Sequence, residues 1–163
     1  RGTMENHIAE TTSGQLVMAM RNQLGSVFFA RSTDRGLSWS HPQASGLSAS
    51  ESMSSLTRIP TTGDLLLVWN NATYDHTYDH GGKRTPLTVA VSRDEGHSWT
   101  YVKNIEDDPD TEFSNLACTH LSDGRFIVSY FTSTMADPNP PGKLGRECMS
   151  LKGAISTLDW LYA

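Results

Sequence analysis

An eight-residue motif occurs twice in this chain, and it constrains the fold more than any other feature of the sequence. Residues 32–39 and 92–99 both read S-x-D-x-G-x-S-W, and the two copies lie 60 residues apart. Short acidic side chains accept backbone N–H groups across a turn, and glycine adopts backbone angles that other residues resist. A turn motif that returns after a long interval indicates repeated structural units.

We interpret this motif as structural rather than ligand-binding. In each copy the aspartate holds the turn, the glycine permits its backbone conformation, and the tryptophan packs back between strands. The residues concerned are Asp34, Gly36 and Trp39 in the first copy and Asp94, Gly96 and Trp99 in the second.

A second pattern, a glycine followed by a short apolar run, occurs three times. It begins at Gly14, Gly63 and Gly124, and each glycine follows a residue typical of tight hairpin turns. A short apolar run bounded by turn signals predicts a buried strand. The three copies divide the chain into units of about four strands each.

The units cover approximately residues 5–50, 51–110 and 111–163. Several units of about four short strands predict an all-β propeller or sandwich, and the repeat favours the propeller. For the third unit we expect strands near 114–121, 125–132, 146–152 and 155–161, with Trp160 in the packing role of Trp99.

The strand order predicts two functionally different faces. Turns between the first and second strands and between the third and fourth strands of a unit share one face, which includes both motif copies. The remaining connections lie on the opposite face, and they include longer segments at 71–84 and 133–145. Insertions in repeat proteins commonly gather on the binding face. We therefore expect a ligand on the face opposite the motif.

Composition narrows the class of partner. The 163 residues carry a formal net charge of −5, whereas surfaces that bind phosphate usually carry a basic excess. Nucleic acid and anionic membranes are therefore not expected partners. No stretch approaches the roughly 18 apolar residues that a membrane span needs.

The two motif copies look like the Asp-box, or BNR, repeat of sialidases and related six-bladed β-propellers. The stretch from Met4 to Asn22 resembles the sialidase segment in which a glutamate opens one strand and an arginine 16 or so residues later ends the next; here these are Glu5 and Arg21. The resemblance implies an exo-α-sialidase type of glycoside hydrolase. It makes Glu5 the base that acts on the nucleophile, and Arg21 and Arg84 the residues that hold the carboxylate of an acidic sugar.

The pattern departs from sialidases at the nucleophile. The position that holds a tyrosine in sialidases falls on Asn115, or on Phe113 in a shifted alignment, and neither can form a phenolate. Tyr74 and Tyr78 in the 71–84 loop could contact the sugar or take over this role. A carboxylate, Glu112 or Asp110, could instead form an acid–base pair.

The loop sequence Tyr74-Asp75-His76-Thr77-Tyr78-Asp79-His80 could also ligate a metal, but we interpret it as a polar loop and expect no metal or cofactor. The alternatives to a sialidase are a non-catalytic carbohydrate-binding or scaffold propeller and a glycosidase of different specificity on the same fold.

Three units make half of a six-bladed ring. We therefore expect either further blades N-terminal to this chain or a homo-oligomer that completes the propeller. The family resemblance suggests a secreted or periplasmic protein, and the sequence leaves the compartment open.

Overall fold

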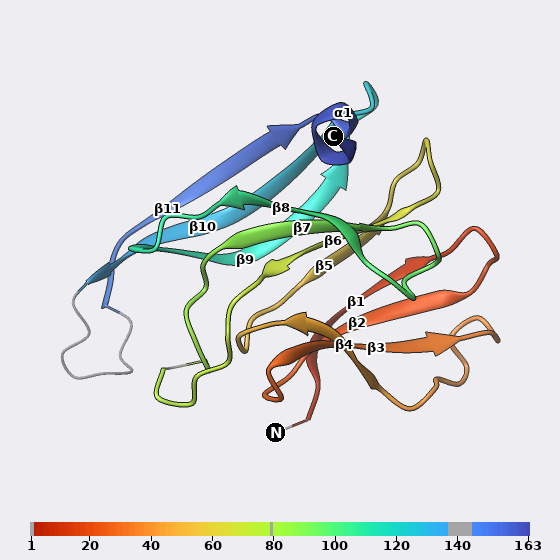
Figure 1. The fold of residues 1–163 in the computed structure, drawn as a ribbon, viewed down its shortest axis with the longest axis horizontal. Helices are drawn as coiled ribbons and strands as arrows, with labels where there is room; N and C mark the ends of the chain where they lie inside the picture. The colour runs from red at the N-terminus through yellow and green to blue at the C-terminus, as the bar shows by residue number, and fades with distance from the viewer. Residues whose placement is uncertain (1, 79, 137–144) are drawn as a thin grey trace.

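The computed structural model describes residues 2–78, 80–136 and 145–163, which form three antiparallel sheets and one short helix. We call the sheets blades 1, 2 and 3 in chain order. Figure 1 shows them side by side, with blade 2 between the other two. Among the described residues, no helix is long and apolar enough to cross a membrane.

Blades 1 and 2 are four-stranded, and neighbouring strands in the chain are neighbours in the sheet. The strands of blade 1 are β1 (Met4–Glu10), β2 (Leu16–Arg21), β3 (Ser26–Ser32) and β4 (Gln43–Ser48). Those of blade 2 are β5 (Ser55–Arg58), β6 (Leu65–Asn70), β7 (Leu87–Ser92) and β8 (Thr100–Glu106).

Blade 3 departs from the four-strand expectation. Its described strands are β9 (Thr111–His120), β10 (Phe126–Ala136) and β11 (Gly145–Ser156), in the order β11-β10-β9. The fourth strand predicted near 155–161 was wrong, because α1 (Leu158–Tyr162) occupies this segment. The Thr157 side chain accepts a hydrogen bond from the backbone N–H of Trp160, which is the N-cap interaction that starts a helix.

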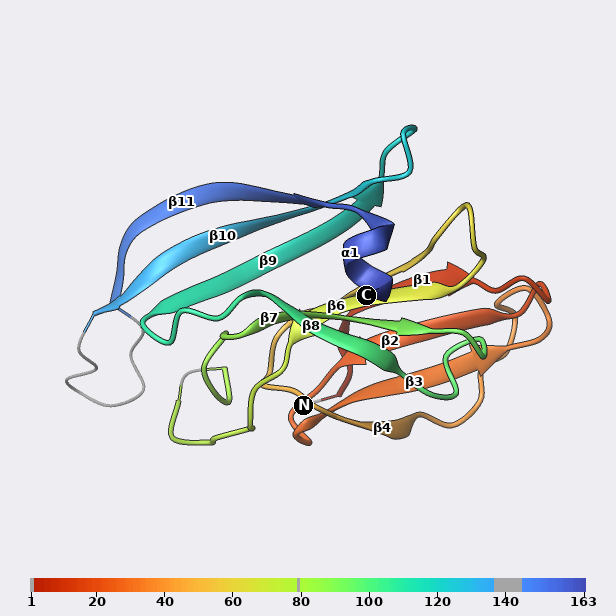
Figure 2. The same ribbon diagram turned by 45° about the horizontal axis from the view of Figure 1, so that its top comes forward.

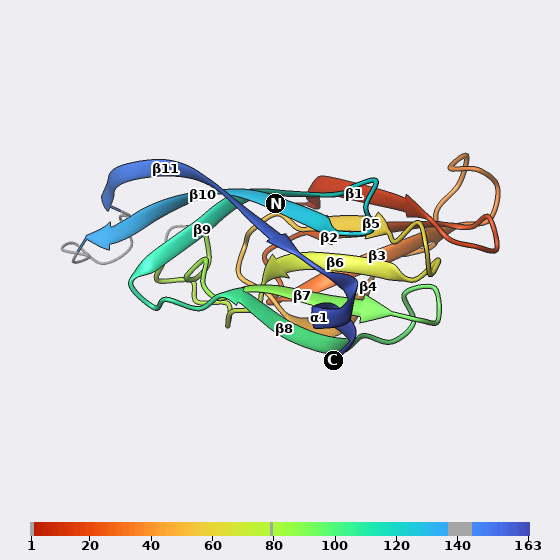
Figure 3. The same ribbon diagram turned by 90° about the horizontal axis from the view of Figure 1, so that it is seen from above.

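Trp160 therefore does not stack on a neighbouring blade as Trp99 does. It packs at the edge of the cluster between blades 2 and 3, where its backbone carbonyl accepts a hydrogen bond from Lys103 of β8. Figure 3 shows α1 lying over blade 2, beside β7 and β8.

Strand periodicity explains how blade 2 holds the molecule together. Every residue of β6 is buried, and successive side chains point to opposite faces of the sheet. Leu66 and Val68 pack toward blade 3, whereas Leu65, Leu67 and Trp69 pack toward blade 1. Because blade 2 is covered on both faces, the sequence of its strand β6 is almost continuously apolar. Figure 2 shows the two flanking blades.

The two faces expected from the strand order are present. The turn at residues 11–14 of blade 1 contacts the motif turn of blade 2, where Glu95 accepts hydrogen bonds from the backbone N–H and the hydroxyl of Ser13 at 2.9 and 2.7 Å. In Figure 1 these turns lie at one end of the strands, and the 71–84 loop lies at the other.

Candidate functional site

A charged cluster occupies the face opposite the motif turns, and Arg21 is its centre. Its Nη1 donates to Glu5 Oε2 at 2.5 Å, and its Nη2 lies 3.5 Å from Glu51 Oε1 and 3.1 Å from His80 Nδ1. The Arg21 side chain is 9% exposed, that of Glu51 is 4% exposed, and that of Glu5 is 47% exposed. One guanidinium is thus shared by a buried carboxylate and a solvent-facing one.

Blade 1 positions the first pair through a local irregularity. Met4 pairs with Arg21, and the register between β1 and β2 shifts before His7, so that Glu5 sits in a bulge with φ of 46°. Bulges re-aim side chains and often occur next to functional sites, and a non-glycine residue in the left-handed region is uncommon. The bulge turns the Glu5 carboxylate toward the end of β2, where Arg21 lies.

The 71–84 loop, which connects β6 and β7, covers one side of this cluster. The backbone N–H of Asp75 donates to the carbonyl of Gly81 at 3.1 Å, and this bond closes the loop on itself. The Tyr74 ring packs so tightly over Gly81 that a Cβ there would lie 2.2 Å from Tyr74 Cε2. The fold therefore requires glycine at 81, and the resulting turn carries His80 to Arg21.

The two loop tyrosines border two cavities, and they share one of them. Tyr74 borders a cavity of about 490 Å³ together with Asn22 and Gln23, the two residues that follow Arg21. It also borders a second cavity of about 380 Å³, which Tyr78 and Lys83 share. Asp79 lies outside the described residues, and among the described residues no group of three or more His, Cys, Asp or Glu side chains could hold a metal.

Arg84 lies at the junction of blades 2 and 3, on the same face. Arg84 is 6% exposed. Its backbone carbonyl accepts two hydrogen bonds, one from Asn70 Nδ2 and one from the backbone N–H of Phe113, both at 2.9 Å. Asn70 Nδ2 also donates to the carbonyl of Phe113 at 3.1 Å. Arg84 is therefore anchored by its backbone to the first strand of blade 3.

The two motif turns have the same conformation. Arg35 and Glu95 have φ of 62° and 58°, and the following Gly36 and Gly96 have φ of 87° and 85°. In both turns the aspartate accepts hydrogen bonds from the backbone N–H and the hydroxyl of the serine four residues later. The two distances are 2.9 and 2.6 Å for Asp34, and 2.8 and 2.6 Å for Asp94.

The motif tryptophans differ in their contacts. Trp39 Nε1 donates to the carbonyl of Gly36 at 3.2 Å. Trp99 Nε1 is buried and has no hydrogen-bond partner among the residues that the structure describes. Its ring stacks on Phe29 of blade 1, with 5.4 Å between ring centroids and 13° between the planes. Trp99 thus contributes to the contact between blades 1 and 2.

Residues 1–128 match the family model of the BNR repeat-like domain. This chain belongs to the BNR repeat-like domain family. No curated protein matches the sequence.

The fold of this BNR repeat-like chain is similar to that of several solved glycoside hydrolases. It resembles the intramolecular trans-sialidase of Ruminococcus gnavus, which was solved with oseltamivir carboxylate, with a TM-score of 0.72 and 19% identity over 98% of this chain and 33% of that one. It also resembles the NanB sialidase of Streptococcus pneumoniae, with a TM-score of 0.67 and 16% identity over 95% of this chain and 23% of that one. For the α-L-arabinanase of Penicillium chrysogenum the TM-score is 0.55 and the identity 20%, over 80% of this chain and 41% of that one.

These likenesses confirm the all-β, sialidase-like propeller fold. This BNR repeat-like chain spans about a third of the length of the trans-sialidase that it matches. At 16–20% identity the likeness establishes the fold, and the activity of this chain has to be argued from its residues.

Asn115, which the resemblance aligns with the sialidase tyrosine, lies in a backbone bulge. Asn115 lies nine residues before Gly124, as Glu5 lies nine before Gly14, and it has φ of 51° at a register shift opposite Ser129 and Phe131. The two residues therefore occupy equivalent bulges in blades 3 and 1. Asn115 is exposed, and an amide is no nucleophile for this reaction.

The shifted alternative and the two carboxylates lie in different surroundings. Phe113 is 1% exposed and packs edge-on against Tyr130 in the core between blades 2 and 3. Glu112 is buried next to it in β9, whereas Asp110 is exposed in the turn before that strand. Phe113 therefore has a packing role. The assignment of Asn115 to the nucleophile position stays a prediction.

Glu51 was not singled out from the sequence. It lies in the irregular β4–β5 connection at residues 49–54, where no pattern marks one polar residue over another. Its Oε2 accepts a hydrogen bond from Gln23 Nε2 at 2.7 Å. Its position in the chain is the one sequence signal that points to Glu51. Connections from the last strand of one unit to the first strand of the next lie on the proposed binding face.

The hydrogen bonds in the motif turns predict a dependence of stability on pH. Hydrogen bonds from Ser38 and Ser32 lower the pKa of Asp34 from 3.8 to about 2. Burial alone would raise the pKa of Asp94, but hydrogen bonds from Ser98, Ser92 and His97 outweigh it and lower this pKa also to about 2. A carboxyl with a depressed pKa stabilises the fold above its unfolded value and loses this contribution as the pH falls toward its folded value.

We therefore expect the double variant Asp34→Asn/Asp94→Asn to melt several degrees below the wild type at pH 6. This difference should shrink between about pH 4 and pH 2, because the wild-type carboxylates become protonated in that range. Thermal unfolding followed by circular dichroism across pH 2–6 measures both effects. A difference that stays constant down to pH 2 would contradict the assigned role.

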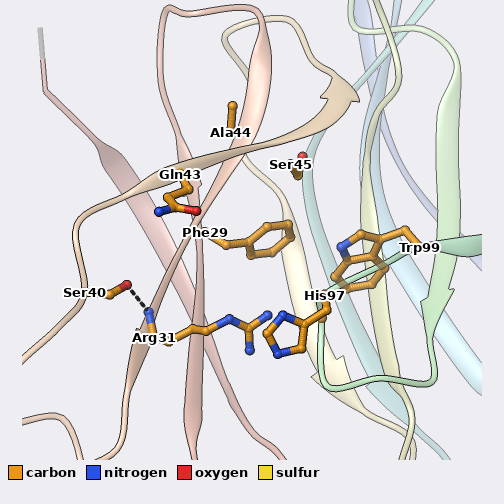
Figure 4. A pocket seen from close by; sticks show the side chains of 9 residues that line it. Phe29, Arg31, Ser40, Gln43, Ala44, Ser45, His97 and Trp99 are labelled. Atoms are coloured by element: carbon orange, nitrogen blue, oxygen red, sulfur yellow. Dashed lines mark hydrogen bonds between the residues drawn. The ribbon is translucent and has the colours of Figure 1, made fainter.

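A further pocket of about 350 Å³ lies between blades 1 and 2, near the motif turn of blade 2; we call it the inter-blade pocket (Figure 4). Arg31 and His97 lie at one end of it, and the stacked Phe29 and Trp99 form its apolar wall. Its lining residues are Phe29, Arg31, Ser40, Gln43, Ala44, Ser45, Gly96, His97 and Trp99.

Proposed function

We propose that this chain is part of a sialidase-like glycoside hydrolase that binds an acidic sugar on the face opposite the motif turns. The observation that supports the proposal is the contact between Glu5 and Arg21. Glu5 lies near the start of β1 and Arg21 at the end of β2, on the face where the sequence predicts a ligand. A guanidinium can bind a carboxylate through two parallel hydrogen bonds, which suits an arginine for a sugar acid.

In this proposal Arg21 and Arg84 hold the sugar carboxylate and Glu5 is the general base. The exposed Glu5 carboxylate can reach a substrate, whereas the buried Glu51 holds Arg21 from behind. Tyr74 and Tyr78 border the cavities beside this cluster and would contact the sugar or its leaving group. Pre-organised charge of this kind stabilises an oxocarbenium-like transition state.

A second candidate is a glycosidase for a neutral sugar, and one observation favours it. Arg21 already faces two carboxylates, Glu5 and Glu51, so these three groups together carry one excess negative charge. Such a cluster attracts an anionic sugar less than a free arginine would. The arabinanase of Penicillium chrysogenum has a similar fold and was solved with arabinobiose, a neutral sugar.

Fluorophore release from aryl glycosides separates these candidates. We expect the purified protein to hydrolyse an aryl α-sialoside and to leave aryl α-L-arabinofuranoside and other neutral aryl glycosides intact. Release from the arabinofuranoside alone would establish the second candidate. Absence of release from every glycoside, together with no calorimetric binding of the sugars, would overturn both.

Binding of a sugar acid tests the two arginines directly. Arg21→Gln and Arg84→Gln should each weaken binding of N-acetylneuraminate by about tenfold to a hundredfold, because each removes charge-assisted hydrogen bonds. The analogue whose carboxylate is reduced to an alcohol should be nearly insensitive to both changes. The exposed Arg58 of β5 supplies the matched control, Arg58→Gln, which should bind as the wild type does. Equal losses for the acid and the alcohol in calorimetric titrations would exclude carboxylate recognition.

A further inference from the structure

The inter-blade pocket is a second place where this chain can bind a ligand. Its lining comes entirely from blades 1 and 2, which are both present here, and it lies toward the motif turns. Arg21 and Glu5 lie on two other strands of blade 1, β2 and β1, at the ends away from the motif turns. The pocket is therefore separate from the charged cluster, and its size suits a single small molecule.

Unpaired hydrogen-bond donors converge on this pocket. Trp99 Nε1 is buried without an acceptor, although the equivalent Trp39 Nε1 is paired. Within the described residues, the Arg31 guanidinium donates one hydrogen bond, from Nη1 to the carbonyl of Glu95 at 2.7 Å. Gln43 and His97 also line the pocket, and both are exposed, so their side chains can turn toward a ligand. A buried donor without an acceptor is unfavourable, and a ligand acceptor would remove that cost.

The charges around the pocket favour an anionic group. In the described part of the chain, no acidic residue lines the pocket, and Arg31 contributes a permanent positive charge. The charges of Asp94 and Glu95 also act on Arg31. However, the Asp94 carboxylate accepts a hydrogen bond from Ser98 and the Glu95 carboxylate accepts one from Ser13. The remaining N–H groups of Arg31 are therefore available to a ligand.

The other walls favour a sugar ring over a simple anion. Phe29 and Trp99 present an apolar surface against which the C–H groups of a pyranose can pack, while Gln43 and His97 can bond hydroxyl groups. We propose that the inter-blade pocket binds a hexuronic acid, with its carboxylate at Arg31 and a ring oxygen or hydroxyl accepting from Trp99 Nε1.

The indole N–H resonances in a ¹H–¹⁵N NMR spectrum test this site by location. The chain has four tryptophans, and Trp99→Phe, which keeps an aromatic ring against Phe29, assigns the Trp99 signal. Titration with glucuronate should shift the Trp99 indole signal and leave those of Trp39 and Trp69 in place, because both of these already donate to backbone carbonyls. Absence of a Trp99 shift at saturating glucuronate would overturn the proposal.

Ligand and protein variants define the class of ligand. Glucose should bind at least tenfold more weakly than glucuronate, and acetate should bind more weakly still; equal binding of either one would contradict a hexuronic acid site. Arg31→Gln should weaken glucuronate binding about tenfold to a hundredfold, whereas the matched Arg58→Gln should not. Gln43→Ala should weaken it severalfold and keeps the test valid if Arg31→Gln does not fold. Unchanged binding in Gln43→Ala and Arg31→Gln would refute the assigned contacts.

Discussion

Replacing Arg21 with methionine should lower the free energy of unfolding by about 3 kcal/mol. The variant keeps most of the side-chain volume but leaves Glu51, which is 4% exposed, as a buried carboxylate without its cation. Removing one partner of a buried ion pair costs about 3–5 kcal/mol, because the remaining charge stays desolvated. We expect the low end, because Gln23 still donates to Glu51. Chemical denaturation followed by tryptophan fluorescence measures the change.

A double variant separates the lost ion pair from lost packing. Arg21→Met/Glu51→Gln should recover most of the stability, because no buried charge then remains unpaired. Arg21→Lys should recover only part of it, since an ammonium cannot contact Glu5, Glu51 and His80 as the planar guanidinium does. The control Arg58→Met, at an exposed position, should change stability by less than about 1 kcal/mol. A double variant no more stable than Arg21→Met would show that packing, and not charge, sets the loss.

Replacing Glu5 with glutamine should lower the turnover number by about a hundredfold to ten-thousandfold on whichever aryl glycoside the protein hydrolyses. Glutamine has the same shape and can still accept a hydrogen bond from Arg21, but it cannot take up a proton as a general base. Because Glu5 is 47% exposed, stability should change little. The Michaelis constant should stay within a few-fold, so the loss appears in the chemical step.

Glu10 provides the matched control for this experiment. It lies at the other end of the same strand, β1, and is also exposed, but it faces the motif turns. Glu10→Gln should therefore retain wild-type turnover. A similar loss in both variants, or no loss in Glu5→Gln, would remove Glu5 from the catalytic step and favour a binding function for the cluster.

Local sequence patterns were sufficient for most of the architecture. The glycine-plus-apolar runs at Gly14, Gly63 and Gly124 correctly marked β2, β6 and β10, because turn chemistry and strand burial both act over a few residues. The last segment of the chain failed this reasoning. Its short apolar run with tryptophan fits a strand or a helix equally well, and the N-cap interaction of Thr157 and packing on β8 favour the helix.

The charged cluster also combines contacts set by local sequence with contacts between residues far apart in the chain. Glu5 and Arg21 could be paired from the sequence, because they are the outer ends of two strands joined by one hairpin, and the register of a hairpin is set by its turn. Glu51 and His80 join them from 30 and 59 residues beyond Arg21, through irregular connections whose course depends on how blades 1 and 2 pack.

The same distinction separates the two motif turns. The repeated sequence specifies one turn conformation, with matching φ angles and hydrogen bonds in both copies, because every interaction within the turn spans four residues or fewer. The environments of Trp39 and Trp99 nevertheless differ, since the ring of Trp99 meets Phe29 of another blade and loses its local acceptor. The sequence alone therefore specifies the motif turns and most of the strands. Packing between blades, which joins residues far apart in the chain, determines which side chains complete the charged cluster and which donors remain open in the inter-blade pocket.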